Sequence, residues 1–286
     1  MQNKAVEPLL FFLMVFFWGS NYIIVKIAYL YDNSATLILL RDVYAFVFSA
    51  ILFYRHVKIP NSLRENAKLF IFGNLNITGF FTLWFFAENY VSASLTSIII
   101  YSYPIISTLF AYLFAGEKLG KIKFSGIIIG FMGIVIIFLK NITYSNYIYL
   151  VMLILGAMSW AGGTVFYRKY LTNYDPANTN TIQLLYAFPV ILIISFFFGG
   201  ININMINIKL NLVMIYMGFL GTAIAYFIFL LLYKKYNVAS ISAYFFTVPI
   251  ISVVLSIVIL NEVVNYYTVI GLIIVCIGIF ISGRFK

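Results

Sequence analysis

Four charged side chains lie deep within long apolar stretches of the chain, where a charge requires a protein or water partner. Lys26 falls near the end of the first apolar run, Arg41 and Asp42 near the start of the second, and Glu88 near the end of the third. A charge at the centre of a membrane helix costs about 2.5–3.5 kcal/mol on insertion scales. We therefore expect Lys26, Arg41 and Glu88 to form a charged vestibule in which at least one cation faces a solute. The planar guanidinium of Arg41 can donate two hydrogen bonds to one carboxylate or phosphate. Structural roles would explain these charges equally well. Glu88 could form an ion pair with Arg41 or Lys26, or Lys26 could extend toward the lipid headgroups.

Aromatic and polar side chains form a second candidate group, because they recur at helical spacing. Asn76, Phe80 and Trp84 follow one another at four-residue intervals, as do Thr222 and Tyr226 in a later run. Residues spaced in this way share one face of a helix. The alternative is helix packing, since small and hydroxyl residues also let helices approach closely. The predicted lining of a mixed-polarity central cavity consists of Trp18, Asn21, Asn76, Trp84, Ser97, Tyr101, Trp160, Thr222, Tyr226, Ser242 and Phe246.

Two prolines, Pro104 and Pro249, fall in the middle of apolar runs, and each opens the phrase PIIS. A proline inside a helix removes one backbone hydrogen bond and kinks the helix. Both are therefore predicted to kink a membrane helix beside the cavity and to free backbone groups near the bilayer centre.

Catalytic and metal chemistry find little support in the sequence. The chain has one histidine, His56, in a basic segment, and one cysteine, Cys276, in an apolar run. It contains no H-E-x-x-H, G-x-S-x-G or G-x4-G-K-[ST] motif, which argues against a zinc hydrolase, a serine hydrolase and a nucleotide-driven pump. No metal, cofactor or internal disulfide is expected, and an intramembrane enzyme is the weaker alternative.

The composition indicates a membrane protein. Of 286 residues, 64% are hydrophobic and 9% are charged, against about 25% charged in soluble domains. Only helices and closed barrels satisfy their backbones in lipid, and continuous apolar runs of about 20 residues indicate helices. The net charge of +10 is spread over short loops, so membrane lipid, and no nucleic acid, is the expected partner.

Ten apolar runs are long enough to be membrane helices, which predicts an all-α integral membrane fold. Their predicted boundaries are Pro8–Ala28, Ala35–Tyr54, Leu69–Val91, Ser94–Ala115, Ile122–Leu139, Tyr147–Tyr167, Thr181–Phe198, Leu212–Leu232, Val238–Leu260 and Tyr267–Ile281.

The second half of the chain repeats the first. Shifted by 145 positions, Glu117 falls on Glu262 and the two PIIS prolines coincide, while nearer the N-terminus the offset is 142. We therefore divide the chain into two five-helix repeats, 1–143 and 144–286. Because five crossings are an odd number, the second repeat must point the opposite way through the bilayer. Inverted repeats of this kind are typical of secondary transporters.

The distribution of basic residues predicts the orientation of the chain. With the N-terminus inside, fourteen of the 18 Lys and Arg residues fall on the inner side, so both termini are expected to be cytoplasmic. Glu117 is then inside and Glu262 outside. Each glutamate either sits at an interface, where it favours the dipole of the next helix, or acts as one of two symmetric gates.

The order of several short motifs resembles the EamA branch of the drug/metabolite transporter superfamily. The motifs are W-G-S-N-Y with Lys26 closing the first run, L-L-R-D in the second, and SAS before and GEKL after the fourth. The second half repeats the proline, has N-E-V in place of the acidic motif and closes on G-x6-G. It departs from the first half where Gln183 stands at the position of Arg41, so only one half supplies that charge. The resemblance implies ten helices and a carrier of small metabolites, often outward.

These observations favour a secondary transporter that moves small organic metabolites, such as amino acids or related amphipathic solutes, out of the cell by alternating access. A flippase for lipids or lipid-linked molecules within the same superfamily is the alternative. The expected location is the cell membrane, and the expected partners are a small-molecule substrate and membrane lipid. The G-I-I-I-G segment at Gly126–Gly130 indicates either internal packing or a homodimer contact.

Overall fold

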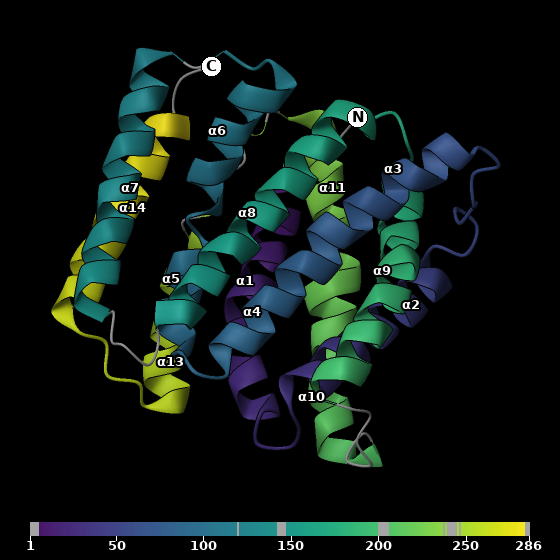
Figure 1. Ribbon diagram of the computed structural model, residues 1–286, viewed down its shortest axis with the longest axis horizontal. Coiled ribbons are helices and arrows are strands. Elements are labelled where there is room, and N and C mark those ends of the chain that lie inside the picture. The colour runs from purple at the N-terminus through teal and green to yellow at the C-terminus, as the bar shows by residue number, and fades with distance from the viewer. Residues whose placement is uncertain are drawn as a thin grey trace.

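The protein is a bundle of helices. A computed structural model describes residues 6–118, 120–141, 147–199, 206–236, 238, 245 and 247–283. Every regular element in this part of the chain is a helix. Figure 1 shows the helices side by side, with α7 and α14 together at one edge and α2 and α9 toward the other.

The helices follow the predicted apolar runs, so the all-helical prediction is confirmed. In chain order they are α1 Val6–Ala28, α2 Ser34–Leu52, α3 Leu63–Gly73, η1 Asn74–Gly79, α4 Phe80–Glu88, α5 Ala93–Ile100, α6 Tyr103–Ala115, α7 Lys121–Asn141, α8 Tyr147–Tyr170, α9 Pro176–Phe198, α10 Ile208–Gly218, η3 Phe219–Ile224, α11 Ala225–Lys235, α13 Thr247–Leu260 and α14 Tyr266–Gly283, of which η1 and η3 are π-helical.

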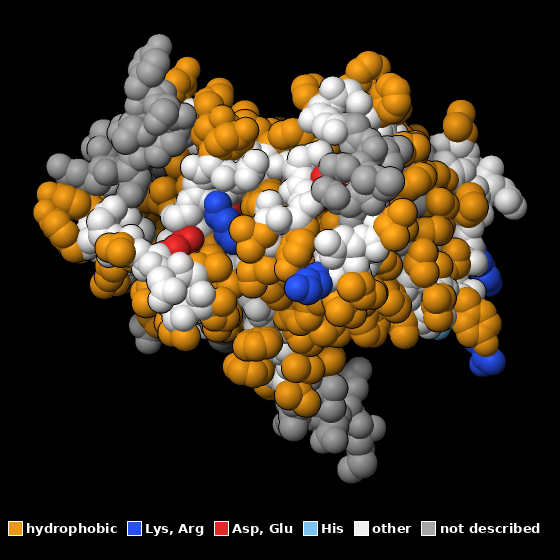
Figure 2. Space-filling view, turned by 90° about the horizontal axis from the view of Figure 1, so that it is seen from below, with side chains coloured by type: hydrophobic (Ala, Val, Ile, Leu, Met, Phe, Trp, Pro, Cys, Tyr) orange, Lys and Arg blue, Asp and Glu red, His pale blue; other side chains and the backbone are white. Residues whose placement is uncertain are grey.

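The surface is suited to lipid. By length and composition, seven helical stretches of the described chain can cross a membrane, and the shorter α13 and α14 are apolar as well. Large hydrophobic side chains such as Phe131 and Phe197 point outward. Figure 2, which views the lower end of the bundle in Figure 1, shows scattered charged side chains among hydrophobic and uncharged ones. A water-exposed protein would not present so much apolar surface, so the chain is a multi-pass membrane protein.

Three helices begin four or more residues before their apolar runs. The third span begins at Leu63 rather than Leu69, the seventh at Pro176 rather than Thr181, and the eighth at Ile208 rather than Leu212. The side chain of Asp175 accepts a hydrogen bond from the Ala177 N–H, and Pro176 takes the first helical position. Both are helix-start signals, so capping residues mark the start of α9 better than hydropathy does.

The fourth predicted span is broken rather than kinked. α5 ends at Ile100 and α6 begins at Tyr103, with Tyr101 and Ser102 between them. Pro104 therefore lies in the first turn of α6, where a missing N–H leaves no helical hydrogen bond unmade. The structure thus replaces the expected kink at Pro104 with two helices that meet at Tyr101.

α6 and α13 occupy equivalent places in the two halves and end in the same way. Pro249 is near the start of α13, although 239–244 and 246 lie outside the described residues. Gly116 and Asn261 follow the two helices with left-handed φ angles of 72° and 54°. The Glu117 N–H donates to the Ala111 carbonyl, and the Glu262 N–H donates to the Ser256 carbonyl, at 3.2 Å in both. This is a helix C-cap repeated at an offset of 145.

α7 and α14 pack so closely that their backbones touch. A Cβ atom on Gly278 would lie 2.3 Å from the Gly130 nitrogen, and one on Gly133 would lie 2.7 Å from the Gly271 oxygen. The contact partner on α14 moves toward its N-terminus as the chain advances along α7, so these two helices are antiparallel. Glycine allows this approach because it has no side chain. Gly130 and Gly133 of α7 therefore pack against α14 of the same chain.

Candidate functional site

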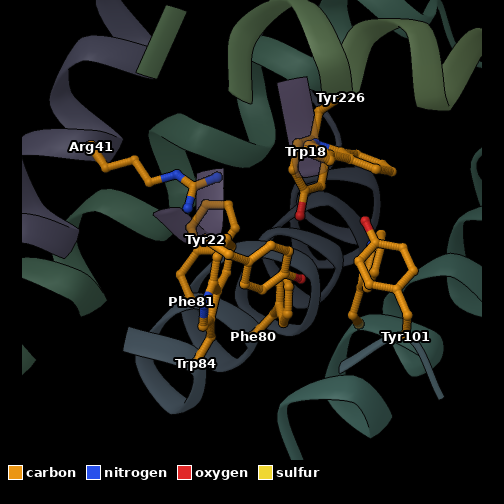
Figure 3. Close-up of a pocket in the computed structure, with 9 residues that line it drawn as sticks. Trp18, Tyr22, Arg41, Phe80, Phe81, Trp84, Tyr101 and Tyr226 are labelled. Carbon is orange, nitrogen blue, oxygen red and sulfur yellow. The ribbon is translucent and has the colours of Figure 1, made fainter. Parts of the chain in front are cut away.

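A small internal cavity lies where α1, α2, α4, α8 and α11 meet beside the break between α5 and α6 (Figure 3). The cavity has room for about one water molecule. The volume within which the centre of a water-sized sphere can move is about 10 Å³. The side chains thus close the cavity in this conformation. It is lined by Trp18, Tyr22, Arg41, Phe80, Phe81, Trp84, Tyr101, Trp160 and Tyr226.

The sequence predicts most of this lining, and two residues of it, Tyr22 and Phe81, are not predicted. Tyr22 lies four residues after Trp18, on the same face of α1, so the spacing could have revealed it. Phe81 is next to Phe80, which was on the predicted stripe, and the stripe gives no reason to include it. The predicted residues that line the cavity are Trp18, Arg41, Trp84, Tyr101, Trp160 and Tyr226.

The two equivalent tryptophans meet in this cavity. The rings of Trp18 and Trp160 are 5.3 Å apart and nearly perpendicular. Trp18 Nε1 donates a hydrogen bond to the Gly221 carbonyl at 3.2 Å. Trp160 is held by stacking on Phe80 at 5.0 Å and on Tyr103 at 3.8 Å, while its buried Nε1 has no hydrogen-bond partner. The two halves therefore both contribute to one aromatic wall, and only Trp160 keeps a donor available.

Arg41 is the one charged residue of the lining, and it is 1% exposed. Its Nε donates to Thr222 Oγ1 at 2.9 Å. Its Cζ lies 3.8 Å from the centre of the Phe81 ring and 5.0 Å from that of Trp84. Within the described chain it forms no ion pair, and its Nη1 has no hydrogen-bond partner. Cation–π contact with aromatic rings takes the place of a carboxylate.

Lys26 and Glu88 meet without forming the expected side-chain pair. Lys26 Nζ donates to the main-chain oxygen of Glu88, and Trp84 Nε1 donates to the Glu88 carboxylate. Glu88 is fully buried, and its Oε1 has no partner. Neither Arg41–Glu88 nor Lys26–Glu88 is an ion pair among the described residues. Trp84 links this carboxylate to the cavity wall.

Gln183, the counterpart of Arg41, belongs to a buried polar network. Asn76 Nδ2 donates to Gln183 Oε1 at 2.8 Å, and Gln183 Nε2 donates to Asn180 Oδ1 at 3.0 Å. Asn180 Nδ2 in turn donates to the Ala223 carbonyl at 2.9 Å. Asn76 therefore holds helices together and lies outside the cavity lining.

The remaining predicted residues lie beside the cavity or outside the described chain. Ser97 Oγ donates to the Ser94 carbonyl at 2.8 Å, so it serves its own helix. Asn21 is fully buried against Gly221, and neither polar atom of its amide has a partner. Thr222 reaches the cavity only through Arg41. Ser242 and Phe246 lie outside the described residues.

The described chain is thus an apolar helical bundle around a closed cavity of aromatic side chains and one arginine. The model of the EamA-like transporter family matches the chain twice, over residues 6–139 and 147–284. The chain therefore belongs to the EamA-like transporter family.

Its relatives carry transporter names. An uncharacterized transporter of Bacillus subtilis, YvbV, is 26% identical over 96% of this chain and 91% of its own length. A probable amino-acid metabolite efflux pump of Escherichia coli is 22% identical over 96% and 94%. A crystal structure that is 14% identical superposes with a TM-score of 0.72 over 98% of this chain and 97% of that one, which shows likeness of fold alone. The family and the named relatives are transporters, so the chain is not an enzyme.

Proposed function

We propose that the protein is a secondary carrier that exports small organic metabolites, amino acids or related amphipathic solutes, by alternating access. The observation that carries this proposal is the closed cavity, which takes residues from both halves and contains hydrogen-bond donors without partners. Buried donors in an apolar site are normally satisfied, and a bound solute would satisfy them. The name of the Escherichia coli relative supports an amino-acid metabolite and an outward direction.

The proposed architecture is ten crossings in two inverted repeats, about 1–143 and 144–286, with both termini cytoplasmic. The antiparallel contact of α7 with α14 supports it, because equivalent helices of inverted repeats must point in opposite directions. The π-helical segments η1 and η3 support it as well, since they differ by 145 positions at both ends. A cell-membrane location follows from this proposal.

Alternating access requires this cavity to open. With room for about one water molecule it admits no metabolite, so the aromatic side chains must separate on the side that faces solvent. The break between α5 and α6 beside Tyr101 is a place where two short helices can tilt independently. Such an opening would expose Arg41 and the tryptophan pair to one side at a time.

Transport in proteoliposomes tests the proposal. Purified protein should exchange at least one radiolabelled solute from a panel of amino acids, nucleobases and small organic acids, and the exchange should saturate. Tyr226→Ala should lower this exchange at least about tenfold per folded molecule, because it removes a wall of the cavity. Phe131→Ala, on an outward-facing position, is the matched control and should exchange like the wild type.

Lipid scrambling is measured in the same vesicles. Scrambling of fluorescent phospholipid without exchange of any solute would replace the carrier by the flippase alternative. Equal exchange by Tyr226→Ala and the wild type would remove the cavity from the pathway.

A further inference from the structure

Arg41 fills an aromatic cage that would otherwise suit a cation. Its Cζ lies 3.8 Å from the centre of the Phe81 ring, 5.0 Å from that of Trp84 and 5.4 Å from that of Phe85. Figure 3 shows the guanidinium extending from α2 toward Phe81, Tyr22 and Trp84. Rings at such distances attract a positive charge, most strongly where water is absent. An aromatic cavity of this kind is a ready site for organic cations unless a protein cation occupies it.

Three polar groups of the lining are hydrogen-bond donors that lack partners. Arg41 Nη1, Trp160 Nε1 and the Tyr226 hydroxyl are all buried without a hydrogen-bond partner. No acidic side chain lines the cavity. Two buried carboxylates lie outside this lining. Glu88 accepts a hydrogen bond from Trp84, and Asp42, whose carboxylate oxygens have no hydrogen-bond partner, follows Arg41 in a helix, where neighbours face different directions.

We propose that Arg41 sets the charge selectivity of this cavity, which takes a carboxylate-bearing solute with a flat aromatic body and rejects organic cations. The inference rests on the proposed carrier function and specifies its substrate class. The carboxylate would accept from Arg41 Nη1 and from the free donors of Trp160 and Tyr226, while the flat body replaces ring contacts within the aromatic wall. Rejection follows because a cation would meet a fixed positive charge already seated on the rings.

Removing the guanidinium should therefore reverse the preference. Arg41→Gln introduces the residue that the second half has at the equivalent position, Gln183. The variant loses the fixed charge and leaves the Phe81, Trp84 and Phe85 rings free for a ligand cation. The charge selectivity of this cavity should depend on Arg41 alone, because no other charged residue lines it.

Two probes with the same ring system test the reversal by isothermal titration calorimetry of purified full-length protein. Indole-3-acetate carries a carboxylate and tryptamine carries an ammonium group. Wild-type protein should bind indole-3-acetate at least about tenfold more tightly than tryptamine, and Arg41→Gln should bind tryptamine at least about tenfold more tightly than indole-3-acetate. Arg41→Lys, which keeps the charge, should retain the wild-type order.

Two further measurements separate selectivity from damage to the fold. Melting temperatures establish that each variant is folded, and Phe81→Leu added to Arg41→Gln should abolish the gained tryptamine binding because it removes the ring closest to the charge. Tighter binding of tryptamine by the wild type, an unchanged preference in Arg41→Gln, or no binding of either probe to any variant would overturn the proposal. The carrier function would survive these results if the solute panel still exchanged in proteoliposomes.

Discussion

Arg41 and Gln183 occupy equivalent positions in the two halves, and each reaches a π-helical segment of the opposite half. Arg41 donates to Thr222 in η3, and Gln183 accepts from Asn76 in η1. The geometry is shared, and the chemistry differs: Gln183 is satisfied within a polar network, whereas Arg41 keeps an unpaired donor in the cavity. A polar side chain at this position thus connects the two halves, and only the first half adds a charge there.

The π-helical segments give both halves the same local irregularity. η1 and η3 lie at the same register of the repeat, and each directly follows a glycine against which the opposite half packs: Gly73 against Gln183, and Gly218 against Tyr44 and Arg41. A π-helical turn contains an extra residue and is frequent at functional sites. It moves the following residues around the helix axis, so η1 and η3 aim the aromatic faces of α4 and α11 at the cavity.

Substitutions of the glycines at the α7–α14 contact should lower stability most, and they test whether the two halves are equivalent there. Gly133→Ala and Gly278→Ala each place a methyl group within 2.7 Å or less of opposing backbone. Each should destabilise the protein by about 1–3 kcal/mol, the usual range for overpacking, and by similar amounts. Gly162→Ala is the control, because nothing lies within 4 Å of its added Cβ. Melting temperatures in detergent check this, and a wild-type value for Gly278→Ala would contradict the close contact.

A second prediction sharpens the comparison of Gln183 with Arg41. Gln183→Leu leaves the Asn76 amide and the Asn180 carbonyl without partners, at a cost of about 1–3 kcal/mol. Arg41→Gln removes a buried unpaired charge and should cost less stability. Solute exchange per folded molecule should be retained by Gln183→Leu and lost by Arg41→Gln. The reverse pattern would show that Gln183 belongs to the site and Arg41 to the scaffold.

The tryptophan pair gives a third contrast. Trp18→Phe loses the hydrogen bond to Gly221, worth about 0.5–1.5 kcal/mol. Trp160→Phe loses a donor that has no partner in the protein, so its melting temperature should change less while its solute exchange falls further. Thermal melts and exchange assays on the two variants decide the point. Equal losses of stability would mean that Trp160 Nε1 is satisfied within the protein.

The smallest expected effect concerns the glutamates. Both carboxylate oxygens of Glu262 accept from the Ala93 and Ser94 N–H groups at the start of α5, at 2.7 and 3.1 Å. A carboxylate there stabilises a helix N-terminus by about 0.3–1 kcal/mol, so Glu262→Gln should lower the melting temperature slightly. If the repeat holds, Glu117→Gln lowers it equally, because Val238 is the counterpart of Ala93. An effect of Glu262→Gln indistinguishable from zero would contradict the cap.

The sequence predicted the helices well because continuous apolar runs have few other solutions in lipid. It predicted much of the aromatic wall because Trp18 recurs as Trp160 in the repeat and other aromatic residues follow helical spacing. It misplaced Asn76, since the stripe Asn76–Phe80–Trp84 assumes a regular helix and η1 inserts a π-helical turn within it. Asn76 is thereby turned toward Gln183 and away from the cavity.

Two other features depended on partners that spacing does not reveal. Glu262 caps α5, a helix of the opposite half, rather than the helix that follows it. Arg41 packs on aromatic rings instead of pairing with Glu88, and Trp84 contacts both the guanidinium and that carboxylate. These partners are set by the tertiary structure, so they cannot be predicted from residue spacing in the sequence.

If the two halves are inverted copies that share one cavity, single cysteines at equivalent positions of the two halves must react from opposite sides of the membrane. Glu117→Cys and Glu262→Cys are made separately in a Cys276→Ser background and treated with a membrane-impermeant maleimide in right-side-out and inside-out vesicles. We expect labelling of position 117 from the cytoplasmic side and of position 262 from the opposite side. Labelling of both positions from one side would contradict the inverted arrangement.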